Sequence, residues 1–402
     1  MITTEEAQKI ISSQIRGYGT EMVSLENGIN RVLREDLKAD RDFPPYNRVS
    51  MDGIAIQHAV FANGQKVFPV VGIAAAGSSQ LNLDQSAACV EVMTGAILPA
   101  NTDTVIRYED VEITDGKATV VVNEIREGQN VHNQGLDRKA GEIVVKLGSL
   151  LSAPEIGIGA TVGTANIQVS KVPRTLIVSS GDELVEIDEK PAPHQIRKSN
   201  TYLLKASLKQ YGIRADQVHL VDDLEKIKIQ LTDFFSNYDV IILSGGVSKG
   251  KFDFIPQALE TLGVNKFFHK VKQRPGKPFW FGKHPQGTLV FALPGNPVSS
   301  FMCLQCYVLP WLTASLGLTS SFTMKGRLAK DVVFKPDLAY FMQVKVEINE
   351  EGYFLAIPVE GHGSGDLANL VDADGFLQLP IGKEHFKSGE VYPLHLYRNQ
   401  FF

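Results

Sequence analysis

The sequence has few cysteines, no long apolar run and no large excess of charge of either sign. Its three cysteines, Cys89, Cys303 and Cys306, cannot form a fully paired disulfide framework, so we expect a protein of the reducing cytoplasm. No apolar run approaches the roughly 20 residues that span a bilayer, and we expect no membrane association. The 40 basic and 45 acidic residues give a formal charge of −5, which gives no indication of nucleic-acid binding.

The sequence also lacks several common catalytic motifs. It has no P-loop lysine motif, no GxSxG turn and no HExxH motif, which counts against the common classes of NTPase, hydrolase and zinc protease. Cys303 and Cys306 form a CxxC pair, but it lies in an apolar stretch without a second cysteine pair or a nearby histidine cluster. We therefore expect both cysteines to pack inside the protein on a helix.

The apolar content is sufficient for several domains. The 402 residues correspond to two to four domains at about 100 to 200 residues each, and 44% of them are hydrophobic. The first 40 residues have helical spacing, with Thr3 or Thr4 as a candidate N-cap, and short β-branched runs from Phe43 to Val131 predict a β-rich module. We expect four parts: residues 1–45 with 132–170 as an N-terminal linking domain, 46–131 as a small β-rich domain, 171–317 as an α/β domain, and 322–402 as a C-terminal β domain.

Strands and helices alternate in the third part. Continuous apolar runs predict buried strands at 175–180, 217–221, 240–244 and 288–294. Amphipathic spacing predicts helices packed between them at 201–212 and 224–238. This order predicts a parallel α/β domain.

Three of these strands run directly into loops with the sequences GDEL, GGVSKGKFD and GNPVSS. Ligands of open parallel sheets bind beyond the carboxyl ends of the strands, so we expect these loops to frame a pocket. Gly245 and Gly246 allow a close approach of the backbone, and Ser244 and Ser248 add hydroxyls. Such a loop suits phosphate or another oxyanion, although many strand ends use glycine only to turn.

A basic segment, HKVKQRPGKPFWFGKH, follows in this otherwise acidic protein. Its cations suit phosphates or molybdate-like dianions, although a solvated strand edge carries similar charge. Two prolines stiffen the segment, which favours a preorganised ligand loop. The cations are Lys270, Lys272, Arg274, Lys277 and Lys283.

Carboxylates stand at the same loop ends. Bound phosphates attract Mg²⁺, which prefers one or two carboxylates together with phosphate oxygens and water, and Glu183 and Asp253 are the best candidate ligands. Each has a second interpretation as a charge at a helix terminus. For Asp222 in DDLE, a helix cap is the favoured interpretation.

Five separated motifs resemble the MoeA family of molybdopterin molybdenumtransferases, which includes the E domain of gephyrin and plant molybdenum insertases. They occur in the family's order and are PPYNRVSMDGIAI, MTGAILPANTDTVIRYED, SSGDEL, SGGVSKGKFD and LPGNPVSSF. The later stretch GHGSGDLANLVDADGFLQLP resembles the signature of the family's last domain. Together the motifs cover nearly the whole chain.

The resemblance implies a multidomain α/β plus β fold, with a MoaB/MogA-like α/β domain that binds molybdopterin, an elongated N-terminal linking and dimerisation domain, and a C-terminal domain like a β-barrel. It implies a Mg²⁺-dependent transferase that inserts molybdate into adenylylated molybdopterin and releases AMP. It further implies a homodimer whose pocket lies between the α/β domain of one subunit and the MDG-containing domain of the other. A molybdopterin adenylyltransferase is the implied upstream partner.

The family's functional residues map onto this sequence motif by motif. The implied catalytic residues are Asp52, Asp137, Glu183, Asp222 and Asp253, with Glu183 and Asp253 as metal ligands. The implied substrate-binding and anion-binding residues are Thr94, Ser244, Gly245, Gly246, Ser248, Lys251, Lys270, Arg274, Lys277, Pro294, Asn296, Pro297 and Ser364. For Asp52 the residues alone favour another role, because SMDG is typical of a tight turn in which Asp bonds its own backbone.

Three positions depart from the family's usual residues. His132 and Gln343 stand where arginine is common, and Lys198 stands where aspartate is common. These changes indicate altered substrate affinity, a paralogue for another metal or anion such as tungstate, or compensation by Lys198, Lys249 and Lys251. The sequence is also compatible with two alternatives to an insertase: a non-catalytic gephyrin-like binding scaffold, and a nucleotide-dependent transferase for another small molecule.

Overall fold

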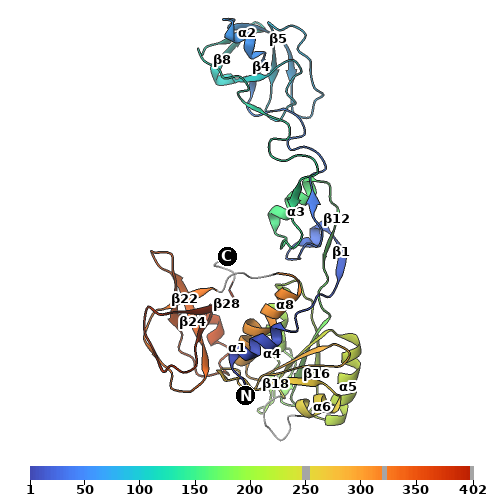
Figure 1. Cartoon of the computed structure of the whole chain (residues 1–402), viewed down its shortest axis with the longest axis vertical. Coiled ribbons are helices and arrows are strands. Elements are labelled where there is room, and N and C mark those ends of the chain that lie inside the picture. The colour runs from blue at the N-terminus through green and yellow to red at the C-terminus, as the bar shows by residue number, and fades with distance from the viewer. Residues whose placement is uncertain (247–253, 319–323, 399–402) are drawn as a thin grey trace.

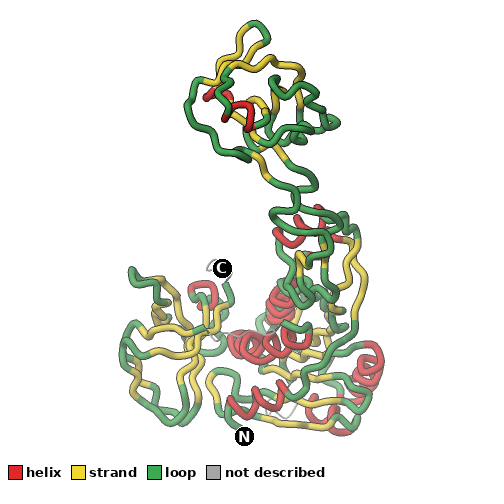
Figure 2. The backbone as a smooth tube through the Cα atoms, turned by 45° about the horizontal axis from the view of Figure 1, so that its top comes forward, coloured by secondary structure: helices red, strands yellow, loops and turns green. Residues whose placement is uncertain are grey.

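The computed structural model describes residues 1–246, 254–318 and 324–398 and is elongated (Figure 1). A small β domain lies at one end of the long axis, and a narrow linking module joins it to the rest. The α/β domain and the C-terminal β domain lie side by side at the other end, as the turned view in Figure 2 also shows. This architecture confirms the expected multidomain α/β plus β class. None of the helices within these ranges is long and apolar enough to cross a membrane.

The N-terminal 40 residues contain one α-helix, not a continuous helical layer. Helix α1 (Thr4–Ser12) begins at a capping box in which Thr3 Oγ1 accepts from the Glu6 amide and the Glu6 carboxylate accepts from the Thr3 amide. Strand β1 (Thr20–Ser24) follows, because these residues pair antiparallel with β12 (Asn166–Ser170) far along the chain. Pairing between distant segments thus overrides local helical spacing.

The linking module is built from short elements of both flanking segments. A 3₁₀-turn η1 (Leu25–Gly28) and helix α3 (Ala153–Thr161) pack beside a pairing of β2 (Leu37–Lys38) with β11 (Ile143–Val145). Its own core includes Leu33, Leu151 and Ile167. Helix α1 packs elsewhere, because Ala7 and Ile11 belong to the core of the α/β domain. The 1–45 segment therefore contributes its first helix to the neighbouring domain.

The small β domain is a six-stranded sheet of order β7-β4-β6-β5-β9-β8. Two apolar clusters form its core, one around Val90 and Val105 and the other around Phe68 and Ile106. The pairing of β3 with β10 joins the domain to the linking module. Its elements are β3 (Arg48–Val49), β4 (Gly53–Ile56), α2 (His58–Ala62), β5 (Val67–Ala74), β6 (Cys89–Val92), β7 (Thr104–Arg107), η2 (Tyr108–Asp110), β8 (Val111–Thr114), β9 (Lys117–Val120) and β10 (Val131–His132).

The α/β domain has the predicted parallel strands, and two further strands extend its sheet through antiparallel pairings. The order is β16-β13-β17-β21-β20-β18, and the first four strands are parallel. Strands β20 and β18 are antiparallel neighbours because a short loop reverses the chain between them. The strands are β13 (Thr175–Ser180), β16 (Asp216–Leu220), β17 (Val240–Ser244), β18 (Asn265–His269), β20 (Trp280–Lys283) and β21 (Leu289–Leu293), with β14 (Leu184–Val185) paired to β15 (Ile196–Arg197) beside them.

Helices cover both faces of this sheet (Figure 1). Helices α5 (Leu224–Asn237) and α6 (Ile255–Thr261) pack on one face. Helices α1, α4 (Asn200–Lys209), α7 (Pro297–Cys303) and α8 (Leu309–Ser315) pack on the other. A π-helical segment, η3 (Leu304–Val308), joins α7 to α8. Cys303 and Cys306 are buried on this helical run, as the apolar CxxC stretch predicted.

The basic segment is the loop that reverses the chain between β18 and β20. Because β18 runs parallel to β21, this loop leaves the sheet at the same edge as the carboxyl ends of β13, β17 and β21. Strand β19 (Gln273–Arg274) within the loop pairs in parallel with β24 (Ala339–Ile348) of the C-terminal domain. The chain reversal therefore brings the predicted basic loop to the expected edge of the sheet.

The C-terminal domain is a closed barrel of five strands. The strands pair in the ring β24-β25-β22-β28-β26 and back to β24, which confirms the expected barrel-like domain. The interior includes Met342, Val344, Leu377 and Leu394. Its elements are β22 (Lys325–Leu328), β23 (Val332–Val333), β24 (Ala339–Ile348), β25 (Phe354–Pro358), α9 (Asn369–Asp372), β26 (Gly375–Leu379), β27 (His385–Phe386) and β28 (Val391–Leu396).

Candidate active site

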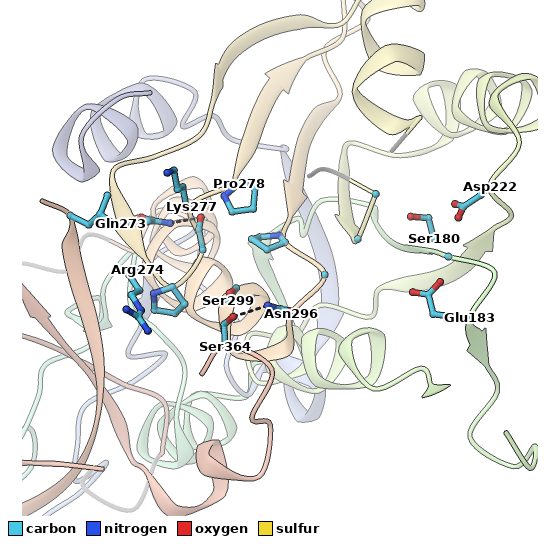
Figure 3. Close-up of a pocket in the computed structure, with 18 residues that line it drawn as sticks. Ser180, Glu183, Asp222, Gln273, Arg274, Lys277, Pro278, Asn296, Ser299 and Ser364 are labelled. Atoms are coloured by element: carbon cyan, nitrogen blue, oxygen red, sulfur yellow. Dashed lines mark hydrogen bonds between the residues drawn. The ribbon is translucent and has the colours of Figure 1, made fainter. Parts of the chain in front are cut away.

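A pocket of about 610 Å³ lies beyond the carboxyl ends of the parallel strands, where the sequence predicted it. Arg274 and Lys277 stand on one side, Glu183 and Asp222 stand on the opposite side, and polar side chains lie between them (Figure 3). Nine predicted site residues line this pocket: Glu183, Asp222, Gly245, Gly246, Arg274, Lys277, Pro294, Asn296 and Ser364.

The acidic side forms where β13 and β16 end. Glu183 follows the turn after β13, and Asp222 follows β16, which is the next strand in the sheet. The favoured capping role of Asp222 is wrong, because the Asp223 carboxylate accepts from the Glu225 and Lys226 amides at 3.0 and 3.1 Å. With its neighbour as the cap, Asp222 lies at the pocket.

Gly245 and Gly246, which directly follow β17, form the floor between the two sides. Gly246 has φ +65°, and a Cβ there would stand 2.7 Å from Ser180 Oγ, so this position requires glycine. Ser244 is buried and accepts from Asn200 Nδ2 at 2.9 Å, which gives it a structural role beneath the floor. Asn200 Nδ2 also donates to the Gly295 carbonyl at 2.6 Å and so ties the glycine loop to the GNP loop.

The cationic side comes from two of the predicted basic residues. Arg274 and Lys277 are exposed in the loop and line the pocket. Lys270 and Lys283 do not line it: the Lys270 backbone bonds to Ile2 and Phe279, and Lys283 Nζ donates to Gln14 at 3.4 Å. The positive charge is therefore concentrated at the apex of the loop.

The C-terminal domain closes the pocket from the third side. Asn296 Nδ2 donates to Ser364 Oγ at 2.6 Å, and the Val298 amide donates to the Ser364 carbonyl at 3.1 Å. These bonds fasten the barrel domain to the start of α7 at the pocket. Pro297 is the first residue of that helix and does not line the pocket.

Asp52 and Thr94 lie together in the small β domain. Thr94 donates its amide and its hydroxyl to Asp52 Oδ1, each at 2.6 Å, and these bonds hold the pKa of Asp52 below its ordinary value. The Asp52 carboxylate therefore bonds to a distant segment and not to the backbone of its own turn. Figure 1 shows this domain at the opposite end of the molecule's long axis from the α/β domain.

We expect Thr94→Val to raise the pKa of Asp52 towards its ordinary value, because it removes the hydroxyl donor and leaves only the amide. Any activity that needs the charged carboxylate would then be lost at a higher pH during acidification. A carboxyl-carbon NMR titration measures the shift. Thr102→Val is the matched control, since Thr102 Oγ1 donates to the Pro99 carbonyl and not to Asp52; an unchanged Asp52 titration in Thr94→Val would contradict the prediction.

Asp137 pairs with His132, one of the three residues that differ from those usual in the family. Its Oδ1 lies 3.0 Å from His132 Nε2, and His132 Nδ1 lies 3.3 Å from an Arg48 guanidinium nitrogen. Asp137 therefore lies with the small-domain junction and not in the pocket of its own chain. Lys198 does not replace a pocket cation, because it is nearly buried and pairs with Glu186.

Ser248, Lys251 and Asp253 lie outside the described residues, as does Lys249. Across the described ranges no group of three or more histidine, cysteine or acidic residues is placed to hold a metal ion. Glu183 and Asp222 nevertheless fit Mg²⁺, because this ion is commonly bound by one or two carboxylates and takes its other ligands from phosphate and water.

Several lining residues were missed from the sequence. Ser180 ends β13, directly before the GDEL loop, and Ser299 follows Asn296 by three residues on the start of α7. Strand-end position and helical spacing were available signals for these two. Gln273 and Leu338 gave no signal, because their place depends on the pairing of the loop with the barrel domain.

Three family models match consecutive parts of the chain. The MoeA N-terminal region (domain I and II) matches residues 2–163, a probable molybdopterin binding domain matches 176–314, and the MoeA C-terminal region (domain IV) matches 325–397. The three matched segments follow the order of the domains in the structure.

Full-length relatives agree with these matches. The chain is 39% identical to a molybdopterin molybdenumtransferase from Synechocystis sp., over 98% of this chain and 100% of the relative. It is 29% identical to a molybdopterin molybdenumtransferase from Bacillus subtilis, over 98% and 94%. The solved structure of a molybdopterin biosynthesis MoeA protein from Pyrococcus horikosii aligns with a TM-score of 0.82 at 28% identity, over 99% of this chain and 100% of that chain.

Proposed function

The chain belongs to the MoeA family, and we propose that it is a molybdopterin molybdenumtransferase of molybdenum cofactor biosynthesis that inserts molybdate into adenylylated molybdopterin and releases AMP. The observation that carries this proposal is the pocket with opposite charges on its two sides. Its carboxylates suit a metal-bound phosphoanhydride, and its cations suit an oxyanion. A full-length relative with this name supports the same activity.

The reaction needs both sides of the pocket. In the cleavage step, water attacks a phosphorus of the phosphoanhydride, the bridging P–O bond breaks and AMP leaves. In the transfer step, the two dithiolene sulfurs bind molybdenum and displace a molybdate oxygen, which leaves as water with the two thiol protons. Arg274 and Lys277 would neutralise the anions, and Glu183 and Asp222 would orient the phosphate end. Mg²⁺ held by these carboxylates would offset charge on the phosphates.

A second copy of the chain would complete the site. Asp52 is exposed and charged, and its domain lies far from the pocket of its own chain (Figure 1). We therefore propose a homodimer in which the small β domain of each subunit presents Asp52 and Thr94 to the pocket of the other. A closed twofold assembly of this kind makes two equivalent sites.

A binding scaffold without catalysis is the alternative. A scaffold has no need of clustered carboxylates facing cations, whereas this chain keeps Glu183, Asp222, Arg274 and Lys277 in one pocket. The arrangement favours an enzyme. The pocket residues do not distinguish tungstate from molybdate, because the two dianions have nearly the same size and charge.

Incubation of the purified chain with adenylylated molybdopterin, Mg²⁺ and molybdate tests the proposal. We expect stoichiometric AMP and a cofactor that activates a molybdoenzyme lacking its own. AMP without active cofactor would contradict metal insertion, and the absence of both would contradict the proposed activity. A parallel reaction with tungstate determines the anion preference.

Gln343 provides a separate test of how positive charge beside the pocket contributes to anion binding. It lies on β24 in a cavity of about 470 Å³ that shares Arg274 and Ser364 with the pocket. Its Oε1 is buried without a hydrogen-bond partner among the described residues. An arginine there would add a charged donor, and one charge-assisted hydrogen bond contributes about 1.5–3 kcal/mol.

We expect Gln343→Arg to tighten molybdate binding about tenfold, with the larger gain at low salt. Equilibrium dialysis at two salt concentrations measures the change. Gln210→Arg is the control, because it adds the same charge at an exposed position outside the pocket. Equal affinity in Gln343→Arg and the parent would show that a cation at this position does not contribute.

Free, buried cysteines are in keeping with a reducing cytoplasm, which we propose as the location. A molybdopterin adenylyltransferase is the proposed upstream partner, because the proposed substrate carries an adenylate.

A further inference from the structure

Gln273 is a polar residue with no exposed surface at the base of the basic loop. Burial of an amide costs free energy unless its donor and acceptor are both satisfied. A methionine or leucine would fill the same space without that requirement. The hydrogen-bond partners of this amide therefore indicate the role of Gln273.

Both ends of the Gln273 amide are bonded. Its Oε1 accepts from the Tyr307 hydroxyl. Its Nε2 donates to the Gly276 carbonyl at 2.9 Å and lies 3.6 Å from Cys303 Sγ. One side chain thus connects the helical run below the loop to the apex of the loop, and a dashed line in Figure 3 marks its bond to the Gly276 carbonyl.

The apex is seated directly on helix α7. Gly276 has φ +85°, and a Cβ there would stand 2.8 Å from both Cys303 Sγ and Met302 Cε. The loop is closed by a bond of 3.0 Å from the Val271 amide to the Lys277 carbonyl. Arg274 and Lys277 flank this seated glycine, so their direction follows from how Gly276 is held.

Tyr307 comes from the π-helical segment of the run from α7 to α8. A π-turn has wider spacing than an α-helix and changes the direction of the side chains that follow, and such turns are frequent at functional sites. Burial raises the pKa of Tyr307 well above its ordinary value, so the hydroxyl stays a donor over the working pH range.

The loop is also held from the barrel domain. Strand β19 pairs with β24, and the Ala339 amide donates to the Lys272 carbonyl at 3.0 Å. The Gln273 side chain supplies the opposing attachment, on the α/β side. The loop therefore has one support from each of the two domains that form the pocket.

We propose that Gln273, held by Tyr307, is a positioning residue that fixes the loop so that Arg274 and Lys277 face the substrate anions. Its role as a residue for anion capture rests on the proposed function. Its role in holding the loop does not, because that role can be measured without turnover.

The test uses Gln273→Met and Tyr307→Phe, separately and together, in the full chain. Each removes part of the same network and keeps most of the volume. We expect KM for the anionic substrates to rise about tenfold with little change in kcat, because a displaced loop weakens anion capture more than the chemical steps. The double variant should show no more than the larger single effect, since residues of one network are not additive.

Leu312→Ala is the control for loss of stability. Leu312 is buried in the same core one helical turn further on, and its truncation destabilises by about 2–5 kcal/mol without removing any bond to the loop. We expect parent KM in this variant. A similar KM increase in Leu312→Ala, or parent KM in both network variants, would overturn the proposal.

Hydrogen exchange of the 271–279 peptide separates this proposal from the proposed function. We expect faster exchange of this peptide in Gln273→Met and Tyr307→Phe than in Leu312→Ala. If the parent releases no AMP, the proposed function fails and the exchange result still decides the positioning role. Exchange at the parent rate in both network variants would overturn that role.

Discussion

Glu183→Gln is expected to lower AMP release by about 10²–10³-fold, the usual effect of removing one preorganised electrostatic contact from an active site. Glu183 follows β13 at the acidic side of the pocket, next to Asp222 and opposite Lys277. The change keeps the shape of the side chain and removes its charge. Because Glu183 is exposed, we expect the free energy of unfolding to change by no more than about 0.5 kcal/mol.

The dependence on Mg²⁺ distinguishes a metal ligand from a group that orients water. If Glu183 binds Mg²⁺, higher Mg²⁺ should partly restore AMP release in Glu183→Gln, because the lost ligand weakens metal affinity. Asp188→Asn is the control, since this exposed carboxylate lies in the same loop but outside the pocket. Near-parent AMP release in Glu183→Gln would show that Glu183 does not belong to the proposed site. Unchanged Mg²⁺ dependence would show that it is not a metal ligand.

The α/β domain was predictable because its signals are local and strong. Apolar runs such as 240–244 are continuous, and a strand that is buried on both faces needs that pattern. The rule that ligands bind at the carboxyl edge of a parallel sheet then predicts Gly245, Gly246 and Glu183 at one pocket, and all three line it. The antiparallel β20 was not anticipated, because a reversal of the chain depends on the loop and not on the strand.

The features that the sequence does not predict depend on contacts between distant segments. The β1 residues were expected to be helical, and their strand exists because β12 pairs with them. Asp222 and Asp223 are equivalent in sequence, and only the path of the chain assigns the cap to Asp223. Gln273 carried no motif signal, since its meaning comes from Tyr307 on a distant helix. Local patterns therefore predict elements and loop ends, whereas roles within a site depend on tertiary pairing.

The proposed shared site predicts complementation between two inactive subunits. Asp52→Ala removes the contribution of the small β domain, and Glu183→Ala removes that of the pocket; each homodimer would then lack one component in both of its sites. In a mixed dimer, one site would carry both substitutions and the other would be intact.

After complete exchange at equal concentrations, about half of the dimers are mixed and each has one intact site of two, so we expect about a quarter of the parent's AMP release. Mass spectrometry of differently labelled subunits confirms the exchange. The control mixes Glu183→Ala with Asp222→Ala, two substitutions on the same side of the proposed site, and should recover nothing because neither site of a mixed dimer is intact. Recovery in the first mixture alone would assign Asp52 to the partner's pocket. Equal activity in both mixtures, after confirmed exchange, would mean that each chain works with its own residues and that Asp52 acts only within its own domain.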